Sequence, residues 1–183
     1  MTNSSPVRGA AAGMVSGLVG SLAMAVLSRL WSEAMRGPVL PQEQSLVHQG
    51  GRPDIEVAKK RGQTAGEGGI ATTKVVDEVA EKVMDRPASP RERHQGGQLI
   101  HYLFGAACGL AYGMLVERAP FLKSGRGLLF GAGLWTATIP IILPALRLSA
   151  DPTRYSLSEH AFGFLSHLTY GLATECTRRQ LRG

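Results

Sequence analysis

Hydrophobic residues are gathered into four stretches of the chain that contain no Asp, Glu, Lys or Arg. These uncharged windows cover residues 9–28, 99–116, 127–146 and 160–174. A helix that crosses a bilayer needs about 20 mostly apolar residues, because the hydrocarbon core is about 30 Å thick and a helix rises about 1.5 Å per residue. The pattern therefore predicts four membrane-spanning helices. The predicted spans are residues 9–30, 97–117, 127–147 and 157–176.

Two other interpretations of these windows stay open. The helices of a soluble bundle normally carry a polar stripe, which the first and third windows lack. A secretory signal peptide combines a positive residue, an apolar core and a small-residue cleavage site, and Arg8 and Ala23-Met24-Ala25 imitate this arrangement. The apolar run continues past that site, however, which favours a retained helix.

The second and fourth windows align without gaps at an offset of 58 residues. Residues 104–117 and 162–175 share the pattern F-G-x4-L-x-Y-G-x3-E. The first and third windows match more faintly at an offset of 118, where Arg8-Gly9 falls on Arg126-Gly127; chance similarity between glycine-rich helices is the alternative. The repeat predicts two helical hairpins in the same orientation. The predicted fold is thus an all-α, integral membrane four-helix bundle.

The first hairpin carries a polar insertion, residues 36–95, with ten basic and nine acidic residues. Near its end an apolar face alternates with a charged one, which predicts an amphipathic helix over residues 70–85, on the membrane surface or against the bundle. The apolar face consists of Ile70, Val76, Val79, Ala80 and Val83. Ser89-Pro90-Arg91-Glu92 combines a Ser cap, an early Pro and a Glu three residues after the cap, which predicts a helix start; Ser156-Leu157-Ser158-Glu159 is similar.

Small residues recur along each predicted span and predict close helix packing. Lipid supplies no hydrophobic drive for helix association, so close backbone approach matters in a membrane. The glycines of these stripes are Gly13, Gly17, Gly105, Gly109, Gly113, Gly131, Gly163 and Gly171. Pro140 and Pro144 predict a kink in the third helix, because proline lacks an amide hydrogen and clashes with the preceding turn.

Composition changes this picture little, but the position of the charges indicates an orientation. The chain has 183 residues, of which 44% are hydrophobic and 19% charged, with a mean hydropathy of zero, because apolar spans and the polar insertion cancel. The net charge of +6 comes from basic residues that flank spans and form no patch, which favours contact with anionic lipid over nucleic acid. Short basic loops stay cytoplasmic. We therefore expect a multi-pass protein of the inner (plasma) membrane with both termini in the cytoplasm.

Ionisable residues at membrane depth are costly and are therefore candidate sites. The candidates are His101, His160, His167, Glu117, Glu159 and Glu175. His167 lies nearest the middle of a span, where it would serve as a proton relay, a gate or a ligand for a metal or haem. The alternative is a neutral imidazole that hydrogen-bonds a neighbouring helix, for instance at Thr136 or Thr138. For Glu117 and Glu175, salt bridges to Arg118 and Arg178 are the expected role.

The sequence contains no phosphate loop, nucleophile motif or metal-ligand spacing. We therefore expect no enzyme, no catalytic residue, no metal and no cofactor. The leading hypothesis is a membrane protein that passes or senses protons or small ions. The second is a structural or partner-binding subunit, with a homo-oligomer as one form. The third is a haem- or quinone-binding protein, because His101 and His160 fall at nearly equal depth in the repeat.

The C-terminal block resembles the YagU-like inner-membrane proteins, a bacterial family of unknown function. The resemblance rests on Leu157-Ser158-Glu159-His160, Ser166-His167-Leu168-Thr169-Tyr170-Gly171 and Thr174-Glu175. Tyr112-Gly113, Glu117-Arg118-Ala119-Pro120 and the glycine-rich first helix that runs into Leu30-Trp31 are similar to that family as well. The resemblance implies a bacterial multi-spanning inner-membrane protein of about this size, and it implies no reaction.

Overall fold

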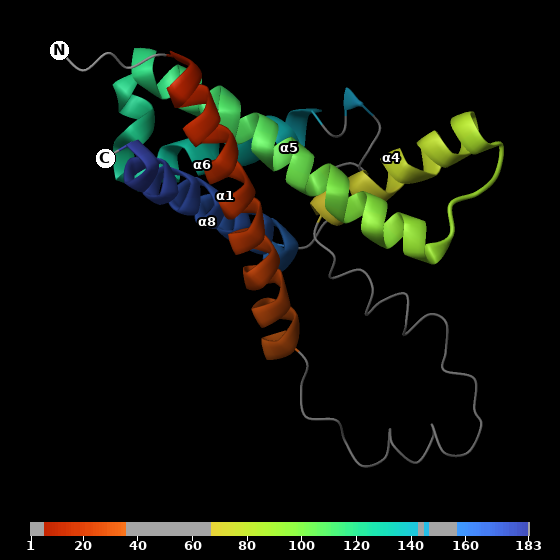
Figure 1. Cartoon of the computed structure of the whole chain (residues 1–183). Coiled ribbons are helices and arrows are strands. Elements are labelled where there is room, and N and C mark those ends of the chain that lie inside the picture. Colours follow the sequence, from red (N-terminus) through yellow and green to blue (C-terminus); the bar gives the residue numbers. More distant parts are fainter. Residues whose placement is uncertain (1–5, 36–66, 143–144, 147–156, 183) are drawn as a thin grey trace.

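The computed structural model describes residues 6–35, 67–142, 145–146 and 157–182. This part of the chain has five α-helices and no strand, which confirms the all-α prediction. The helices are α1 (Pro6–Met35), α4 (Glu67–Met84), α5 (Pro90–Arg118), α6 (Leu128–Ala137) and α8 (Leu157–Arg182). A 3-10 segment, η1 (Pro120–Gly127), joins α5 to α6, and a π-helical turn, η2 (Thr138–Ile142), follows α6. Figure 1 shows the beginning of α1 and the end of α8 at the same end of the molecule.

Helices α1 and α5 are antiparallel and meet through glycine backbones. Gly13 lies against the carbonyl of Gly109, and Gly17 lies against the carbonyl of Gly105, so a Cβ on either residue of α1 would collide with α5. The same holds from the other side, because a Cβ on Gly113 would meet the carbonyl of Gly9. Glycine at these positions lets two backbones approach to van der Waals contact, which is the packing the small-residue stripes predict.

Helices α6 and α8 form a second antiparallel pair with the same construction. Gly131 lies against the backbone of His167, and Gly127 lies against the carbonyl of Gly171. One turn further along, the indole of Trp135 covers Gly163, where a Cβ would lie 3.2 Å from the ring nitrogen. Helix α1 also packs along α8, with the rings of Trp31 and Phe162 5.1 Å apart, so α1 joins the two pairs.

The third predicted span is not one continuous α-helix. Helix α6 ends at Ala137, and the chain continues as the π-helical turn η2, which contains Pro140. Proline has no amide hydrogen and clashes with the carbonyl four residues earlier, and a wider turn accommodates it. The hydroxyl of Thr138 donates to the carbonyl of Leu134 at 2.7 Å within this region. The structure therefore shows a change from α-helical to π-helical geometry around Pro140, while Pro144 and the Ser156 cap lie outside the described residues.

The helix starts predicted in the insertion have counterparts in the structure. Ser89 caps α5 in an extended conformation, its amide donates to Glu92 Oε2 at 2.8 Å, and its hydroxyl accepts from the Glu92 amide at 3.3 Å. This reciprocal arrangement is a capping box. Helix α4 packs against the start of α5, where Val76 covers Gly96. Val79 and Val83, on the predicted apolar face, are 50% and 75% exposed.

Two helices are long and apolar enough to cross a membrane by length and composition. They cover Arg8–Ala34 and Pro90–Arg118, with mean hydropathies of 1.9 and 1.6 in their most apolar windows. Helix α6 has 10 residues and is too short to qualify alone, and α8 has 26 residues but includes polar side chains along its length. Of the four predicted spans, two therefore meet the criterion within the described residues.

Candidate functional site

Polar side chains gather where α1, α5 and α8 meet. Tyr170 of α8 is 2% exposed, and its hydroxyl donates to the carbonyl of Gly105 on α5 at 2.6 Å. Ser21 of α1 is buried beside the same glycine, since a Cβ on Gly105 would overlap the serine hydroxyl. His101, one turn earlier on α5, lies beside the backbone of Ser21. These contacts tie the three helices together at one level of the bundle.

His167 lies on α8 in the same region and is held in a defined tautomer. Its Nδ1 is 2.8 Å from the carbonyl of Gly163, and because a carbonyl only accepts, Nδ1 carries the hydrogen. In the neutral ring Nε2 then keeps a lone pair as the acceptor. The rings of His101 and His167 lie near enough for their charges to interact. His167 therefore hydrogen-bonds to its own helix rather than to Thr136 or Thr138, whose hydroxyls donate to carbonyls of α6.

Three buried hydroxyls in this region lack a hydrogen-bond partner among the described residues. They belong to Ser21, Ser166 and Thr174, which are 1%, 4% and 0% exposed. Ser166 precedes His167 on α8, and Ser21 adjoins His101. A buried hydroxyl without a partner is unfavourable and usually indicates an ordered water or a bound polar group. The interior of the bundle therefore contains two histidines and three unsatisfied hydroxyls, where burying a polar group costs free energy.

His160 does not join this group. Its ring faces the edge of Trp135, with 6.3 Å between the ring centroids, whereas His101 lies beside Ser21 and interacts with His167. The repeat put His101 and His160 at nearly equal depth, but α5 and α8 contact each other with a different register. Tyr170 reaches Gly105, which aligns His101 with His167 instead. The histidine pair that a bound haem would need is therefore a different pair from the predicted one.

A buried ion network lies where α5 and α8 end. Glu175 is fully buried and accepts from Tyr112 at 2.8 Å, from Arg178 at 2.7 and 3.0 Å, and from Arg179 at 2.7 Å. Arg178 is itself only 6% exposed. The two oxygens of one carboxylate thus meet donors from two helices, which is the condition under which a buried charge is tolerated. The predicted pairing of Glu175 with Arg178 is present in the structure.

The other two acidic candidates have different surroundings. Glu117 pairs with Arg182 at 2.5 Å and not with Arg118, because α8 ends beside the last turn of α5. The predicted partner was therefore wrong, although the predicted type of interaction was right. Glu159 lies half-buried in the first turn of α8, about four turns away from Glu175. The six candidates therefore lie in separate places. His101 and His167 are at one level of the bundle, and His160 lies beside Trp135. Glu117 and Glu175 are at one end of the molecule, and Glu159 is at the other.

The two helix pairs use corresponding positions. The offset of 118 residues relates α1 to α6, and the offset of 58 residues relates α5 to α8. With these offsets, the contact of Gly13 with Gly109 corresponds to the contact of Gly131 with His167. In the same way, the contact of Gly17 with Gly105 corresponds to the contact of Trp135 with Gly163. His167 and Trp135 therefore stand in the second pair where the first pair has glycine. The two pairs share a register, and they differ by two large side chains with nitrogen atoms.

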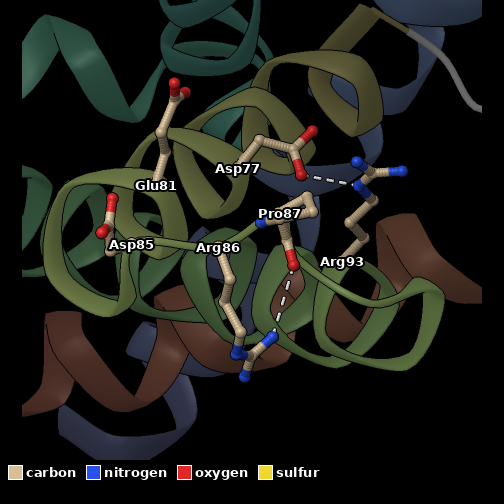
Figure 2. A pocket seen from close by; sticks show the side chains of 6 residues that line it. All are labelled: Asp77, Glu81, Asp85, Arg86, Pro87 and Arg93. Atoms are coloured by element: carbon tan, nitrogen blue, oxygen red, sulfur yellow. Dashed lines mark hydrogen bonds and ion pairs between the residues drawn. The ribbon is translucent and has the colours of Figure 1, made fainter.

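A surface groove of about 430 Å³ lies between α4 and the start of α5. Figure 2 shows its lining, in which Asp77 binds Arg93 at 2.6 Å and Arg86 donates to the carbonyl of Pro87. Arg86 also pairs with Glu92 of the capping box, at 2.6 Å. On the outer face of α4, a 2.8 Å hydrogen bond from the Lys82 ammonium holds the pKa of Glu78 below its usual value. Of these pairs, Asp77 with Arg93 joins α4 to α5, and Arg86 with Glu92 joins the connection between the two helices to α5.

The groups that sequence reasoning missed are those whose partners are distant in the chain. Tyr112 and Glu175 are 63 residues apart, and Tyr170 and Gly105 are 65 residues apart. The one available signal was the repeated Tyr-Gly-x3-Glu, in which the tyrosine of one copy contacts the glutamate of the other. The described residues contain no group of three or more His, Cys, Asp or Glu side chains that is arranged to hold a metal.

The fold and the site define an all-α protein with two helices able to cross a membrane and a buried polar contact among three helices. The chain belongs to the family described as "Protein of unknown function (DUF1440)", whose model matches residues 84–176, about half of the chain. The match begins just before the cap of α5, ends one residue after Glu175, and therefore includes the histidine and glutamate candidates. No curated protein and no solved structure matches the chain.

Proposed function

We propose that the chain is a multi-spanning inner-membrane protein built of two helical hairpins, with both termini in the cytoplasm. About a third of the apolar window of α1 is buried, and 28% of that of α5, so most of both surfaces is free to face lipid. The core helix of a soluble protein would be mostly buried. The glycine contacts between α1 and α5 also support a retained α1 over a cleaved signal segment. The resemblance to the YagU-like proteins points to the same membrane.

We propose further that the protein passes or senses protons or small ions through the polar contact of α1, α5 and α8. The observation that carries this proposal is the combination of the buried, unsatisfied hydroxyls of Ser21, Ser166 and Thr174 with two histidines at the same level of the bundle, His101 and His167. Titratable groups inside a membrane protein are expensive and mark ion or proton pathways. His167 is the central residue, because its Nδ1 is engaged and its Nε2 is left to take up a proton.

Proton flux into vesicles tests this activity. The full chain is reconstituted in liposomes that contain a pH-sensitive dye, and a potassium gradient with valinomycin drives protons inward. We expect flux for the native chain and roughly a hundredfold loss for His167→Ala, the low end of what loss of a proton-transfer group costs. His94→Ala is the matched control, because His94 is exposed in the first turns of α5. Equal flux in native and His167→Ala vesicles would contradict the histidine pathway.

A second function, that of a structural or partner-binding subunit, is favoured by one observation. Large apolar side chains on one side of α5 are exposed, among them Leu99, Leu103 and Phe104 at 53–59%. In a membrane such a surface contacts lipid or a second apolar helix, including a copy of this chain. Absence of proton flux, together with a single crosslinked oligomer in native membranes, would favour this function over ion passage.

A further inference from the structure

One end of the molecule carries a strong excess of positive charge. The start of α1, the end of α5, η1 and the end of α8 lie together there, and they contribute seven Arg and Lys side chains against two carboxylates. At the other end, α4 and the first turns of α5 carry five acidic and five basic side chains from Lys74 to Arg93. The excess is therefore a property of one end alone, within the part of the chain that the structure describes.

The carboxylates at the basic end are already occupied. Glu175 binds Arg178 and Arg179, and Glu117 binds Arg182. Three further cations are left on η1 and its border with α5: Arg118, Lys123 and Arg126. None of these three makes an ion pair with a carboxylate of the described residues. Arg118 and Arg126 are exposed, so their charges are directed to the surroundings of the molecule.

The backbone of η1 holds Arg126 outward in an unusual conformation. Gly125, Arg126 and Gly127 have φ values of 62°, 56° and 92°, all in the left-handed region that favours glycine. Gly127 is required there, because a Cβ would collide with the Gly171 carbonyl and would lie 2.8 Å from the Glu175 side chain. This contact pins η1 to α8. A large side chain at a strained position between two glycines is a basis for proposing a function of that side chain.

An apolar residue completes the surface. Phe121, in the first turn of η1, is 64% exposed within a few residues of all three cations. Aromatic rings beside Arg and Lys at the ends of spans are typical of the membrane interface, where the ring meets acyl chains and the cations meet headgroups. Arginine suits this role because its guanidinium binds phosphate oxygens in two parallel hydrogen bonds.

We propose that Arg118, Phe121, Lys123 and Arg126 form a binding surface for the headgroups of anionic phospholipids. The phosphate groups supply the counter-charges that the described residues do not supply at this end. This inference rests on the proposed membrane insertion and is independent of ion passage. It assigns η1 a partner, and it places η1 at the depth of the headgroups.

Lipid retention tests the proposal. The full chain is purified from membranes of mixed phosphatidylglycerol and phosphatidylcholine, and the retained lipids are counted by native mass spectrometry. We expect the native chain to retain phosphatidylglycerol selectively and Arg118→Gln/Lys123→Gln/Arg126→Gln to retain roughly tenfold less. The matched control is Lys74→Gln/Lys82→Gln/Arg91→Gln, which removes three exposed cations from the other end and leaves retention unchanged.

Two further arms separate the outcomes. Arg118→Lys/Arg126→Lys keeps both charges but loses the paired guanidinium hydrogen bonds, so it should retain more phosphatidylglycerol than the triple glutamine variant and less than the native chain. Inorganic phosphate at millimolar concentration should not displace the lipid, and displacement would indicate a site for free phosphate instead. Equal retention by the native chain and the triple glutamine variant would overturn the proposal. Extraction of the chain from membranes by alkaline carbonate would instead overturn the membrane insertion on which it rests.

Discussion

Glu175 illustrates how one residue fixes the contact between two helices. Its side chain is fully buried and receives hydrogen bonds from Tyr112 of α5 and from Arg178 and Arg179 of its own helix. The pairing with arginine could be predicted, because a residue three or four positions away lies on the same helix face. The bond to Tyr112 could not be predicted from local sequence, because it depends on how α5 and α8 meet.

Arg178 and Arg179 offer a matched comparison of a buried and an exposed partner of the same carboxylate. The Arg178 side chain is 8% exposed and that of Arg179 is 52% exposed. Removal of one partner of a buried ion pair typically costs about 3–5 kcal/mol. We therefore expect Arg178→Gln to lower the free energy of unfolding by about 3 kcal/mol, and Arg179→Gln by less than about 1 kcal/mol. Unfolding in mixed detergent micelles measures both, and equal losses would contradict the assigned burial.

The histidines show the limit of residue-level prediction. Their placement inside uncharged windows identified them as candidates, and the contact of Tyr170 with Gly105 places His167 and His101 at the same level of the bundle. The pairing of His101 with His160 failed, because the repeat gives equal positions within each hairpin and not the register between hairpins. That register is set by contacts such as Tyr170 with Gly105, whose residues are far apart in the chain.

At the scale of elements, the glycines decide which helices meet and at what distance. Two antiparallel pairs use glycines four residues apart, and the stripes were readable in the sequence because a helix returns to the same face every three or four residues. The partner of each stripe was not readable, since every stripe is compatible with every other. The break in the third helix was predicted from Pro140, but its form, a π-helical turn, was not.

Alanine substitutions at Gly131 and Gly133 of α6 distinguish the effect of helix packing on stability from the effect of helix propensity. A Cβ on Gly131 would collide with the backbone of α8 at His167, whereas a Cβ on Gly133 would meet nothing within 4 Å. We expect Gly131→Ala to destabilise the protein by about 1–3 kcal/mol, as overpacking does. Gly133→Ala should be neutral or stabilising by up to about 1 kcal/mol, because alanine favours helix. Thermal melting in detergent compares them, and a tolerated Gly131→Ala would argue against the α6–α8 contact.

The capping box at Ser89 makes a prediction for the start of α5. Replacement of a serine cap by alanine typically costs about 1 kcal/mol, because an amide of the first turn loses its acceptor. Ser89→Ala should therefore accelerate amide hydrogen exchange at Glu92 and Arg93 by roughly fivefold, with little change in the middle of α5. Ser32→Ala is the control, because Ser32 is in α1 and bonds only to the Arg29 carbonyl of its own helix. Unchanged exchange at Glu92 would contradict the capping geometry.

At the scale of the whole molecule, the separation of charged from uncharged residues predicted an all-α chain with several apolar helices. The structure retains two helices that could cross a membrane, α1 and α5. The third and fourth predicted spans, in α6 and α8, do not meet the length and hydropathy criterion, for physical reasons. Helix α6 is interrupted by proline after ten residues, and α8 carries His160, His167 and several hydroxyls among its apolar residues. The average hydropathy of such a segment is a poor indicator of whether it crosses a membrane, because its polar groups can be buried in contacts with other helices.

The most direct test of the account is the side of the membrane on which each end of the two helix pairs lies. Single cysteines are compared in cells expressing the full chain, with a membrane-impermeant maleimide added before and after permeabilisation. Native Cys176 reports one end, and Asp85→Cys and Leu157→Cys report the other, each in a background that lacks the remaining cysteines; all three positions are exposed. We predict that Asp85→Cys and Leu157→Cys react in intact cells and that Cys176 reacts only after permeabilisation. Reaction of all three from the same side would contradict the proposal that both helix pairs cross the membrane.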